Sequence, residues 1–141
     1  MQSDASISID QLATSVSLSR NACWRRIKSL EEAGVIRSRV ALLDAEKVGI
    51  PLVALVQVRT NQHDPKWSKR FRKAVVHMHE VVAVWRMSGD LDYVLRVRVA
   101  SVAGYDAFYQ RLIGEVPMSD VSASFVLEEI KETTSIPLPR S

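Results

Sequence analysis

Residues 18–36, LSRNACWRRIKSLEEAGVI, place apolar and hydrogen-bonding side chains at the spacing of an amphipathic helix. At about 100° per residue, one face of this helix carries the sulfur and aliphatic groups of Cys23, Ile27 and Leu30. The opposite face carries Asn21, Arg25 and Lys28. An asparagine amide pairs with adenine through two hydrogen bonds, and an arginine guanidinium does so with guanine. The segment therefore has the chemistry of a helix that contacts base edges in DNA.

Positive charge is concentrated around this segment. Residues 18–40 hold six Lys or Arg and two Glu, whereas the other residues together are nearly balanced at 13 basic and 14 acidic. Such a concentration is expected if only this part of the chain meets a polyanion, although an ordinary solvated helix also carries charges. We predict that the DNA contacts come from Ser19, Arg20, Asn21, Trp24, Arg25, Arg26, Lys28, Arg37 and Arg39.

Two short helices joined by a tight turn must position these side chains. Ser8 is suited to cap a first helix over about 9–16, and Ser19 to cap a second helix that Gly34 ends. The arrangement is a helix-turn-helix, which favours DNA binding over a merely solvated helix. Residues 35–43, VIRSRVALL, follow as a short extended strand or linker.

The second half of the chain alternates between strand and helix patterns. Strands are predicted in PLVALVQVR, VVAVWRM, YVLRVRV and VSASFVLEEI, with helices opening at Asp64-Pro65 and at Ser101. This βαββαβ order is that of a ferredoxin-like domain, so the fold class is α+β. We divide the chain into a helix-turn-helix at 1–40, a hinge at 41–50 and a ferredoxin-like domain at 51–141.

With both helices on one side of the sheet, its other face stays uncovered and apolar. We expect that face to carry Val53, Leu55, Val81, Ala83, Trp85, Val94 and Val126. Apolar patches of this kind mark association surfaces, although loops or the C-terminal tail are an alternative cover. The sequence therefore predicts at least a homodimer.

The opening stretch also resembles the Lrp/AsnC family of transcription regulators. The matching positions are Leu18, Ser19, Cys23, Arg26, Ile27, Leu30, Glu31, Gly34 and Ile36. The similarity continues through ALLDAEKVGI, MSGDLDYVLRVRV and SFVLEEIKETTSIPL, so it spans nearly the whole chain. The family implies a winged helix-turn-helix regulator that dimerises through its C-terminal domain, often assembles into tetramers or octamers, and responds to an amino acid.

The resemblance places an effector between subunits, near the turn formed by Ser88, Gly89, Asp90, Leu91, Asp92 and Tyr93. Glycine lets the backbone approach a ligand, and the two aspartates are suited to accept hydrogen bonds from an ammonium group. The same residue types also suit a β-hairpin turn for conformational reasons alone. Ser122, Ser124 and Gly114 are secondary candidates.

Two features depart from the family pattern, a helix at the start and the residue at position 17. Members carry a further helix ahead of the helix-turn-helix, and MQSDASIS resembles its end and the following loop, so we expect most of that helix to be missing. Its loss would leave Leu12, Val16 and Ile27 partly uncovered. The family usually has glycine where this chain has Ser17, and a positive φ there would cost serine about 1 kcal/mol.

Other chemistries are less well supported. No nucleophile–base pair indicates an enzyme, and His63, His77 and His79 lack the spacing of metal ligands, so neither a metal nor another cofactor is predicted. Cys23 is interpreted as a core residue. The basic run of Lys66, Lys69, Arg70, Arg72 and Lys73 is interpreted as a solvent face, with DNA contact as its alternative.

The predicted function is sequence-specific transcription regulation, with double-stranded DNA, an amino-acid effector and further copies of the chain as partners. A ligand-binding oligomerisation module that has lost DNA binding is the alternative. A single cysteine and the lack of any apolar run of about 20 residues favour a cytoplasmic protein without a membrane partner.

Overall fold

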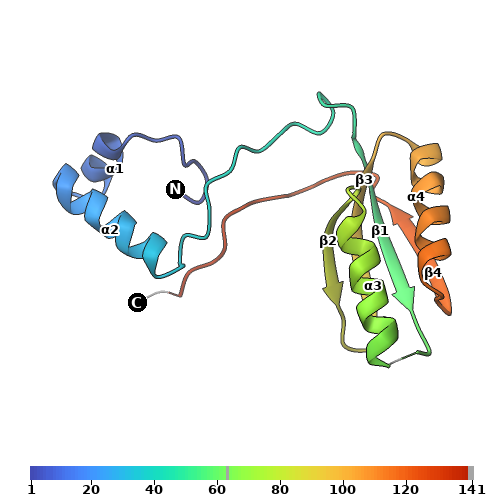
Figure 1. Ribbon diagram of the computed structural model, residues 1–141. Helices are drawn as coiled ribbons and strands as arrows, with labels where there is room; N and C mark the ends of the chain where they lie inside the picture. Colours follow the sequence, from blue (N-terminus) through green and yellow to red (C-terminus); the bar gives the residue numbers. More distant parts are fainter. Residues whose placement is uncertain (63, 140–141) are drawn as a thin grey trace. The chain divides into compact units, whose positions relative to one another are not determined.

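A computed structural model describes residues 1–62 and 64–139 and divides the chain into two compact units (Figure 1). His63, weighed above as a metal ligand, and the last two residues of the predicted second domain lie outside the described residues. The first unit comprises Met1–Leu42 and Ile130–Ser141, and the second comprises Leu43–Glu129. The C-terminal segment, which the sequence-based division assigned to the second domain, thus groups with the helix-turn-helix.

Two capped helices form the body of the first unit: α1 (Ile9–Ser15) and α2 (Arg20–Glu32). The hydroxyl of Ser8 accepts a hydrogen bond from the Gln11 backbone N–H, and the Gln11 side chain accepts one from the Ser8 backbone. Ser19 accepts a hydrogen bond from the Ala22 N–H. Both caps satisfy N–H groups that the first helical turn leaves unpaired, as predicted.

The core of this unit is small. Ala13, Cys23 and Ile27 are buried, with Leu12, Leu18 and Ile36 packed around them. Leu30 was expected on the inward face, but 42% of it is exposed. The reason is geometric, because α1 has only seven residues and its packed residues reach no further along α2 than Ile27. Leu12, Val16 and Ile27 were all expected to be partly uncovered. Val16 is exposed and Leu12 is half-buried, whereas Ile27 is buried, so the expectation for Ile27 is wrong.

The turn between α1 and α2 contains the one non-glycine residue with positive φ among those described. Ser17 has φ of 55°, and the next residue, Leu18, donates its N–H to the carbonyl of Ala13 at 2.9 Å. The left-handed conformation lets the chain reverse between Ser15 and Arg20, which brings Leu18 back onto the small core. Ser17 therefore has the positive φ at which a serine side chain costs about 1 kcal/mol.

Beyond α2 the chain has no strand before the second unit. Gly34 has φ of 69°, and its N–H and that of Ile36 bond to carbonyls of the last helical turn. Residues 35–43 then form a linker, one of the two expected alternatives. Within the predicted hinge, Asp44 accepts hydrogen bonds from the backbone N–H groups of Glu46 and Lys47.

The two ends of the first unit are hydrogen-bonded to each other. The side-chain oxygen of Gln2 accepts from the N–H of Ile136 at 2.7 Å, and the hydroxyl of Thr134 donates to the Gln2 carbonyl at 2.6 Å. Ser3 and Ser135 lie 3.3 Å apart through their hydroxyls. The C-terminal segment is therefore part of the same unit as the helix-turn-helix.

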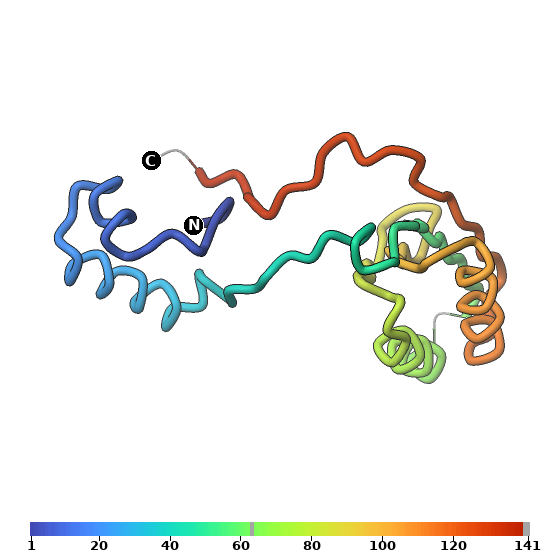
Figure 2. Tube along the Cα trace, turned by 90° about the horizontal axis from the view of Figure 1, so that it is seen from above, coloured from blue at the N-terminus to red at the C-terminus, as the bar shows by residue number. Residues whose placement is uncertain are grey.

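The second unit has the predicted βαββαβ order. Its elements are β1 (Leu52–Arg59), α3 (Pro65–His77), β2 (Val81–Arg86), β3 (Tyr93–Val99), α4 (Val102–Glu115) and β4 (Asp120–Phe125). The strands form one antiparallel sheet in the order β2-β3-β1-β4. Both helices lie on one face of it (Figures 1 and 2). The last strand is shorter than predicted and ends before Leu127.

The main core lies between this sheet and its two helices. Alternate residues of β1 and β3 face the helices, which contribute Phe71 and Phe108 as the largest fully buried side chains. Asp64 caps α3 and Ser101 caps α4, so both helices begin where the sequence indicated. Period-two strands and period-3.6 helices thus account for most of the second unit.

One strand departs from regular alternation. A bulge between Val81 and Ala83 sets Val81 opposite Val97, which faces the helices, and Ala83 opposite Arg96, which faces the other way. Val81 packs against the core, so its predicted place on the open face is wrong. The extra residue of the bulge shifts the alternation of side chains within β2.

Replacing Ser17 with glycine should stabilise the helix-turn-helix by about 1 kcal/mol, because glycine has no Cβ to strain the left-handed conformation. Urea unfolding, monitored through hydrogen exchange at the α1 and α2 amides, measures the change in the free energy of unfolding. The control is Thr14→Gly within α1, where glycine should destabilise the helix-turn-helix by roughly 0.5–1 kcal/mol. Destabilisation by Ser17→Gly would contradict the assignment of strain.

Candidate nucleic-acid interface and ligand site

The exposed face of α2 carries the predicted DNA-contacting side chains. Cys23 and Ile27 are buried, and Asn21, Arg25 and Lys28 are exposed on the opposite side. Trp24 is half exposed, and Arg26 is exposed on the other flank. The helix therefore presents hydrogen-bonding groups to solvent with the orientation that its sequence indicated.

Several of the cations have partners within the first unit. Arg20 lies 3.4 Å from the Asp10 carboxylate, which links the start of α2 to α1. Glu31 binds Lys28 at 2.9 Å and Arg39 at 2.6 Å, so the residue after the helix is held beside its last turn. These contacts fix the flanking cations, whereas Asn21 and Arg25 have no side-chain partner among the described residues.

Glu31 is the acidic residue that organises this end of α2. The hydrogen bond from Lys28, with the charges of Lys28 and Arg39, lowers the pKa of the Glu31 carboxyl. The carboxylate is thus ionised at neutral pH and offsets part of the positive charge near the helix C-terminus. Positive charge without a partner is left toward the N-terminal half of α2, which is the half that enters the major groove in a helix-turn-helix.

The predicted ligand turn connects β2 to β3 and is held at its base. Met87 donates its N–H to the Asp92 carbonyl, and the Asp92 N–H donates to the Val58 carbonyl at the end of β1. Gly89 has φ of 103°, a conformation that side chains rarely adopt, and a Cβ built there would meet no atom. The glycine is therefore required by the backbone rather than by crowding.

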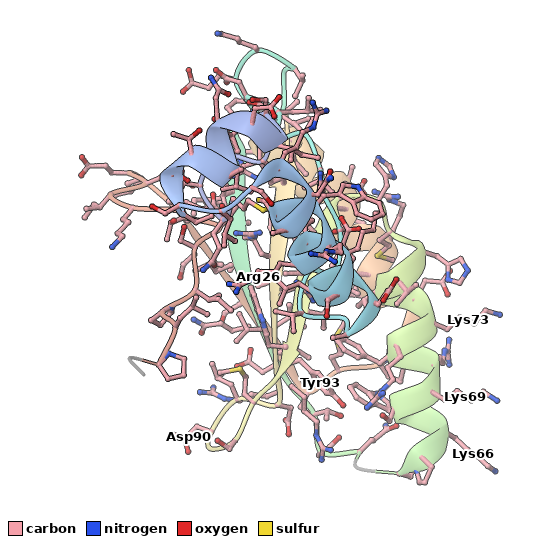
Figure 3. All side chains as sticks on the ribbon, turned by 90° about the vertical axis from the view of Figure 1, so that its left-hand side faces the viewer. Arg26, Lys66, Lys69, Lys73, Asp90 and Tyr93 are labelled. Atoms are coloured by element: carbon pink, nitrogen blue, oxygen red, sulfur yellow. The ribbon has the colours of Figure 1, made fainter. Side chains whose placement is uncertain are left out.

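The two aspartates of this turn have different surroundings. The Asp92 carboxylate accepts the N–H of Thr60 at 2.8 Å, so it anchors the turn to β1. Asp90 is exposed at the tip of the β2–β3 connection, as Figure 3 shows, and its backbone carbonyl accepts from Nε of Arg59 at 3.1 Å. Thr60 and Arg59 thus support the turn, a role that the sequence pattern gave no signal for.

Tyr93 lies inside the second unit rather than at its surface. Its ring centroid is 4.4 Å from that of Phe71 and 5.9 Å from that of Trp67, and only 8% of the residue is exposed. The tyrosine is therefore a core residue that fixes the C-terminal end of the turn. Ser88 and Gly89 are exposed beside Asp90, and Leu91 is half-buried.

The sheet face away from the helices carries both apolar and polar side chains. It carries Val53, Leu55, Ala83, Trp85, Val94 and Val126, which includes every predicted residue except Val81. Trp85 is 47% exposed, an unusual environment for a large aromatic side chain. Arg96 and Arg98 on β3, and Ser122 and Ser124 on β4, lie on the same face.

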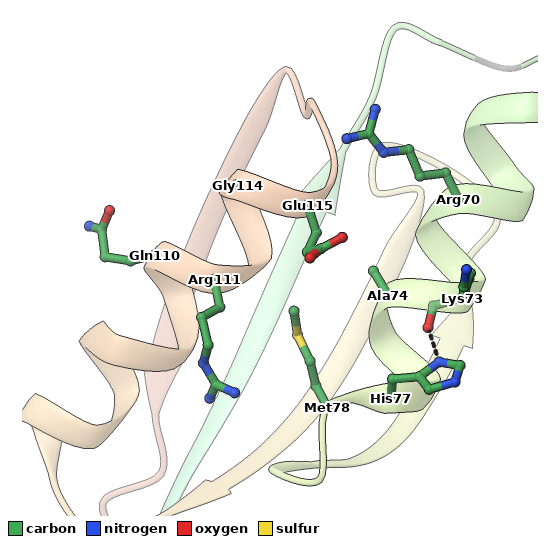
Figure 4. A pocket seen from close by; sticks show the side chains of 9 residues that line it. All are labelled: Arg70, Lys73, Ala74, His77, Met78, Gln110, Arg111, Gly114 and Glu115. Atoms are coloured by element: carbon green, nitrogen blue, oxygen red, sulfur yellow. Dashed lines mark hydrogen bonds between the residues drawn. The ribbon is translucent and has the colours of Figure 1, made fainter.

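A surface cleft of about 790 Å³ lies on the helix side of the second unit, between α3 and α4 (Figure 4). Its lining includes Arg70, Lys73 and His77 from α3 and Arg111 from α4. Arg111 is bound to Glu80, and Nδ1 of His77 bonds the carbonyl of Lys73. The cleft is separate from the predicted ligand turn.

Neither a metal centre nor a membrane segment is found within residues 1–62 and 64–139. This part of the chain holds no group of three or more His, Cys, Asp or Glu side chains placed to bind a metal ion. None of its helices combines the length and the apolar character needed to span a bilayer.

Comparison with known proteins identifies both units. The profile of the Lrp/AsnC ligand binding domain matches residues 53–136, and that of a winged helix-turn-helix DNA-binding domain matches residues 1–37. The chain belongs to the Lrp/AsnC family of transcriptional regulators. It is a DNA-binding regulator and not an enzyme.

Individual relatives of this Lrp/AsnC regulator are themselves described as transcription regulators. The DNA-binding transcriptional activator DecR of Escherichia coli K12 is 46% identical over 139 residues, which cover 98% of this chain and 91% of DecR. An AsnC family transcriptional regulator from Agrobacterium tumefaciens superposes with a TM-score of 0.92 at 49% identity, covering 96% of this chain and 89% of that one.

A further solved relative contains an amino acid. The crystal structure of a transcriptional regulator from Neisseria meningitidis in complex with L-methionine superposes with a TM-score of 0.89 at 32% identity. The match covers 94% of this chain and 86% of the Neisseria chain. The ferredoxin-like unit described above is thus the ligand-binding domain of the family.

Proposed function

We propose that this regulator contacts base edges in the major groove with Asn21 and Arg25 of α2, and that an amino acid bound to its second unit controls the assembly that presents this helix. The proposed base contacts rest on the division of α2 into a buried face and an exposed face. Asparagine and arginine side chains without protein partners are suited to bond adenine and guanine edges.

The surrounding residues would hold the DNA backbone. Arg26 and Arg37 are exposed, and neither has an ion pair with a described residue. The hydroxyl of Ser19 accepts the Ala22 N–H and keeps its own proton to donate to a phosphate, beside the positive end of the helix dipole. Trp24 adds apolar contact, and Arg20, Lys28 and Arg39 add charge from positions that their partners fix.

A second copy of the chain is the proposed cover of the open sheet face. Leu55 and Val94 lie on the two central strands of that face, and Trp85 extends it onto the edge strand. Burying such a surface against its own copy is favourable by roughly 25 cal/mol per Å² of apolar area. Dimerisation would also supply two copies of α2, and higher assembly into tetramers or octamers would build on this dimer.

The β2–β3 turn is the proposed effector site. The exposed carboxylate of Asp90 and the open backbone around Gly89 suit an ammonium group and a carboxylate, the two ends that all amino acids share. Ser88 and Leu91 flank these groups, while Asp92 and Tyr93 hold the turn in place. The methionine complex of the Neisseria relative makes an L-amino acid the ligand class to test first.

The proposed control is a shift of population between assemblies. An effector that binds one assembly more tightly than another favours that assembly by the difference in binding free energy. The separation of the two recognition helices then changes, and it must match half-sites about 34–36 Å apart, or one turn of DNA. Regulation therefore needs no change within α2 itself.

Replacing Arg25 with alanine should cost about 1–3 kcal/mol of binding free energy on a duplex selected from a random pool, and should relax the preference at one base pair. Fluorescence anisotropy at fixed salt measures both effects. Arg86→Ala, which removes an exposed arginine from the second unit, is the control and should bind normally. Unchanged affinity and sequence preference for Arg25→Ala would exclude α2 as the recognition helix.

Replacing Leu55 with glutamate should yield monomers, because burying the carboxylate in the proposed interface costs free energy that pairing with Arg96, its neighbour on β3, does not fully recover. Light scattering coupled to size-exclusion chromatography gives the mass, and circular dichroism verifies folding. Val76→Glu, on the exposed side of α3, should leave the assembly unchanged. If the folded Leu55→Glu variant keeps the wild-type mass, the open face is not the interface.

A thermal-shift panel of the amino acids, beginning with L-methionine, should contain at least one stabilising ligand. At a concentration 100 times the dissociation constant, binding adds about 2.7 kcal/mol to the free energy of unfolding. Asp90→Ala should weaken this stabilisation, whereas Asp106→Ala on α4 should not. If no amino acid stabilises the protein, amino-acid sensing is refuted. If the ligand-induced thermal shifts of the two variants are equal, the effector site does not include the turn.

A further inference from the structure

Helix α3 carries an unbalanced positive charge. Its 13 residues, PKWSKRFRKAVVH, include Lys66, Lys69, Arg70, Arg72 and Lys73 and contain no acidic residue. All five cations are exposed, while Trp67, Phe71, Ala74 and Val75 are buried. The buried side confirms that the helix is amphipathic, but it does not explain why the exposed side has a single sign of charge.

Three lysines form a row along the exposed side. Lys66, Lys69 and Lys73 are separated by three and four positions, and Figure 3 shows them projecting from the same side of α3. We refer to these three residues as the lysine row. Arg72 lies beside the row, and Arg70 lies toward the cleft between α3 and α4 (Figure 4).

The lysine row has no counter-charge within the described residues. Some cations of the second unit are paired, such as Arg59 with Asp120 and Arg111 with Glu80, whereas none of the five on α3 forms an ion pair with a described residue. Like charges three or four positions apart on a helix repel each other, and Lys66 also lies in the first turn, where the helix dipole disfavours a cation. The arrangement weakens α3 in isolation and suits an external polyanion.

The dimensions favour a polymer over a small anion. At about 1.5 Å per residue the row is roughly 10 Å long, and a DNA strand carries about three phosphates over that length at 3.4 Å each. Lys66 and Lys69 do not line the cleft, so a small anion bound there would leave both unpaired. The cleft also contains Glu115, which disfavours an anion at that position.

We propose that the lysine row is a second DNA contact of this regulator, which binds the phosphate backbone of duplex outside the sequence that α2 recognises. The inference rests on DNA binding through α2, because that interaction brings duplex to the molecule. The row contributes affinity without sequence preference, since phosphates are the same at every base pair. It also makes binding depend on the length of DNA beyond the recognised site.

Salt dependence tests the proposal. The triple variant Lys66→Gln, Lys69→Gln and Lys73→Gln removes the row, and a second variant with arginine at the same three positions keeps its charge. Both are compared with the wild-type chain on two duplexes, the selected site alone and the same site within flanking DNA several helical turns longer. Affinity is measured from about 50 to about 200 mM salt.

Each phosphate contact contributes about 0.9 to the slope of log affinity against log salt. On the long duplex, the glutamine variant should lose about 2.7 from this slope per engaged protomer, and the arginine variant should match the wild type. On the short duplex, all three proteins should keep the same sequence preference. Equal slopes for wild type and glutamine variant on the long duplex would overturn the proposal.

The outcome also separates this inference from the proposed function. If Arg25→Ala relaxes the preference at one base pair but the glutamine variant matches the wild type, α2 binding holds and the lysine row is not a DNA contact. If the wild-type chain binds neither duplex, the proposed function fails first. The substituted side chains are exposed, so both triple variants should fold like the wild type. Circular dichroism verifies that their helix content is unchanged.

Discussion

The second unit depends on a sheet that is covered on only one side. Helices α3 and α4 bury one face of it around Phe71 and Phe108, and no third helix of the described chain lies on the other. The other face exposes apolar groups such as Trp85, which water solvates only at a cost. The dimer that we propose follows from this constraint, and the pairing of recognition helices follows from the dimer. The proposed regulation by assembly would therefore be a consequence of how the strands and helices are ordered along the chain.

The two units differ in how much core supports them. Among the described residues, the core cluster of the helix-turn-helix has three buried members, whereas the main core cluster of the second unit has fifteen. Helix α2 must serve its own core with Cys23 and Ile27 while leaving the opposite side free for DNA. A unit with so little buried surface depends strongly on its helix caps, whereas an exposed ion pair such as Arg20 with Asp10 contributes little. Binding to DNA would add contacts to the face that folding leaves unused, so the folded unit and its complex stabilise each other.

Local chemistry made much of this structure predictable. Ser8, Ser19, Asp64 and Ser101 each cap the helix that they were expected to begin, and the alternation in β1 and β3 assigned their faces correctly. The bulge at Val81 carries no glycine or proline to indicate it, because the irregularity arises from pairing with β3. Leu30 was misplaced because its cover depends on where α1 ends, and the burial of Tyr93 depends on the aromatic residues of α3. The lack of partners around the lysine row is equally a property of the folded chain and not of its pattern.

The grouping of the C-terminal segment with the helix-turn-helix has a mechanical consequence. The backbone leaves the first unit after Leu42 and rejoins it at Ile130, where the Gln2 hydrogen bonds with Thr134 and Ile136 hold the returning segment. The two units are thus joined by two stretches of chain, and loss of the Gln2 hydrogen bonds would leave only one of them in place.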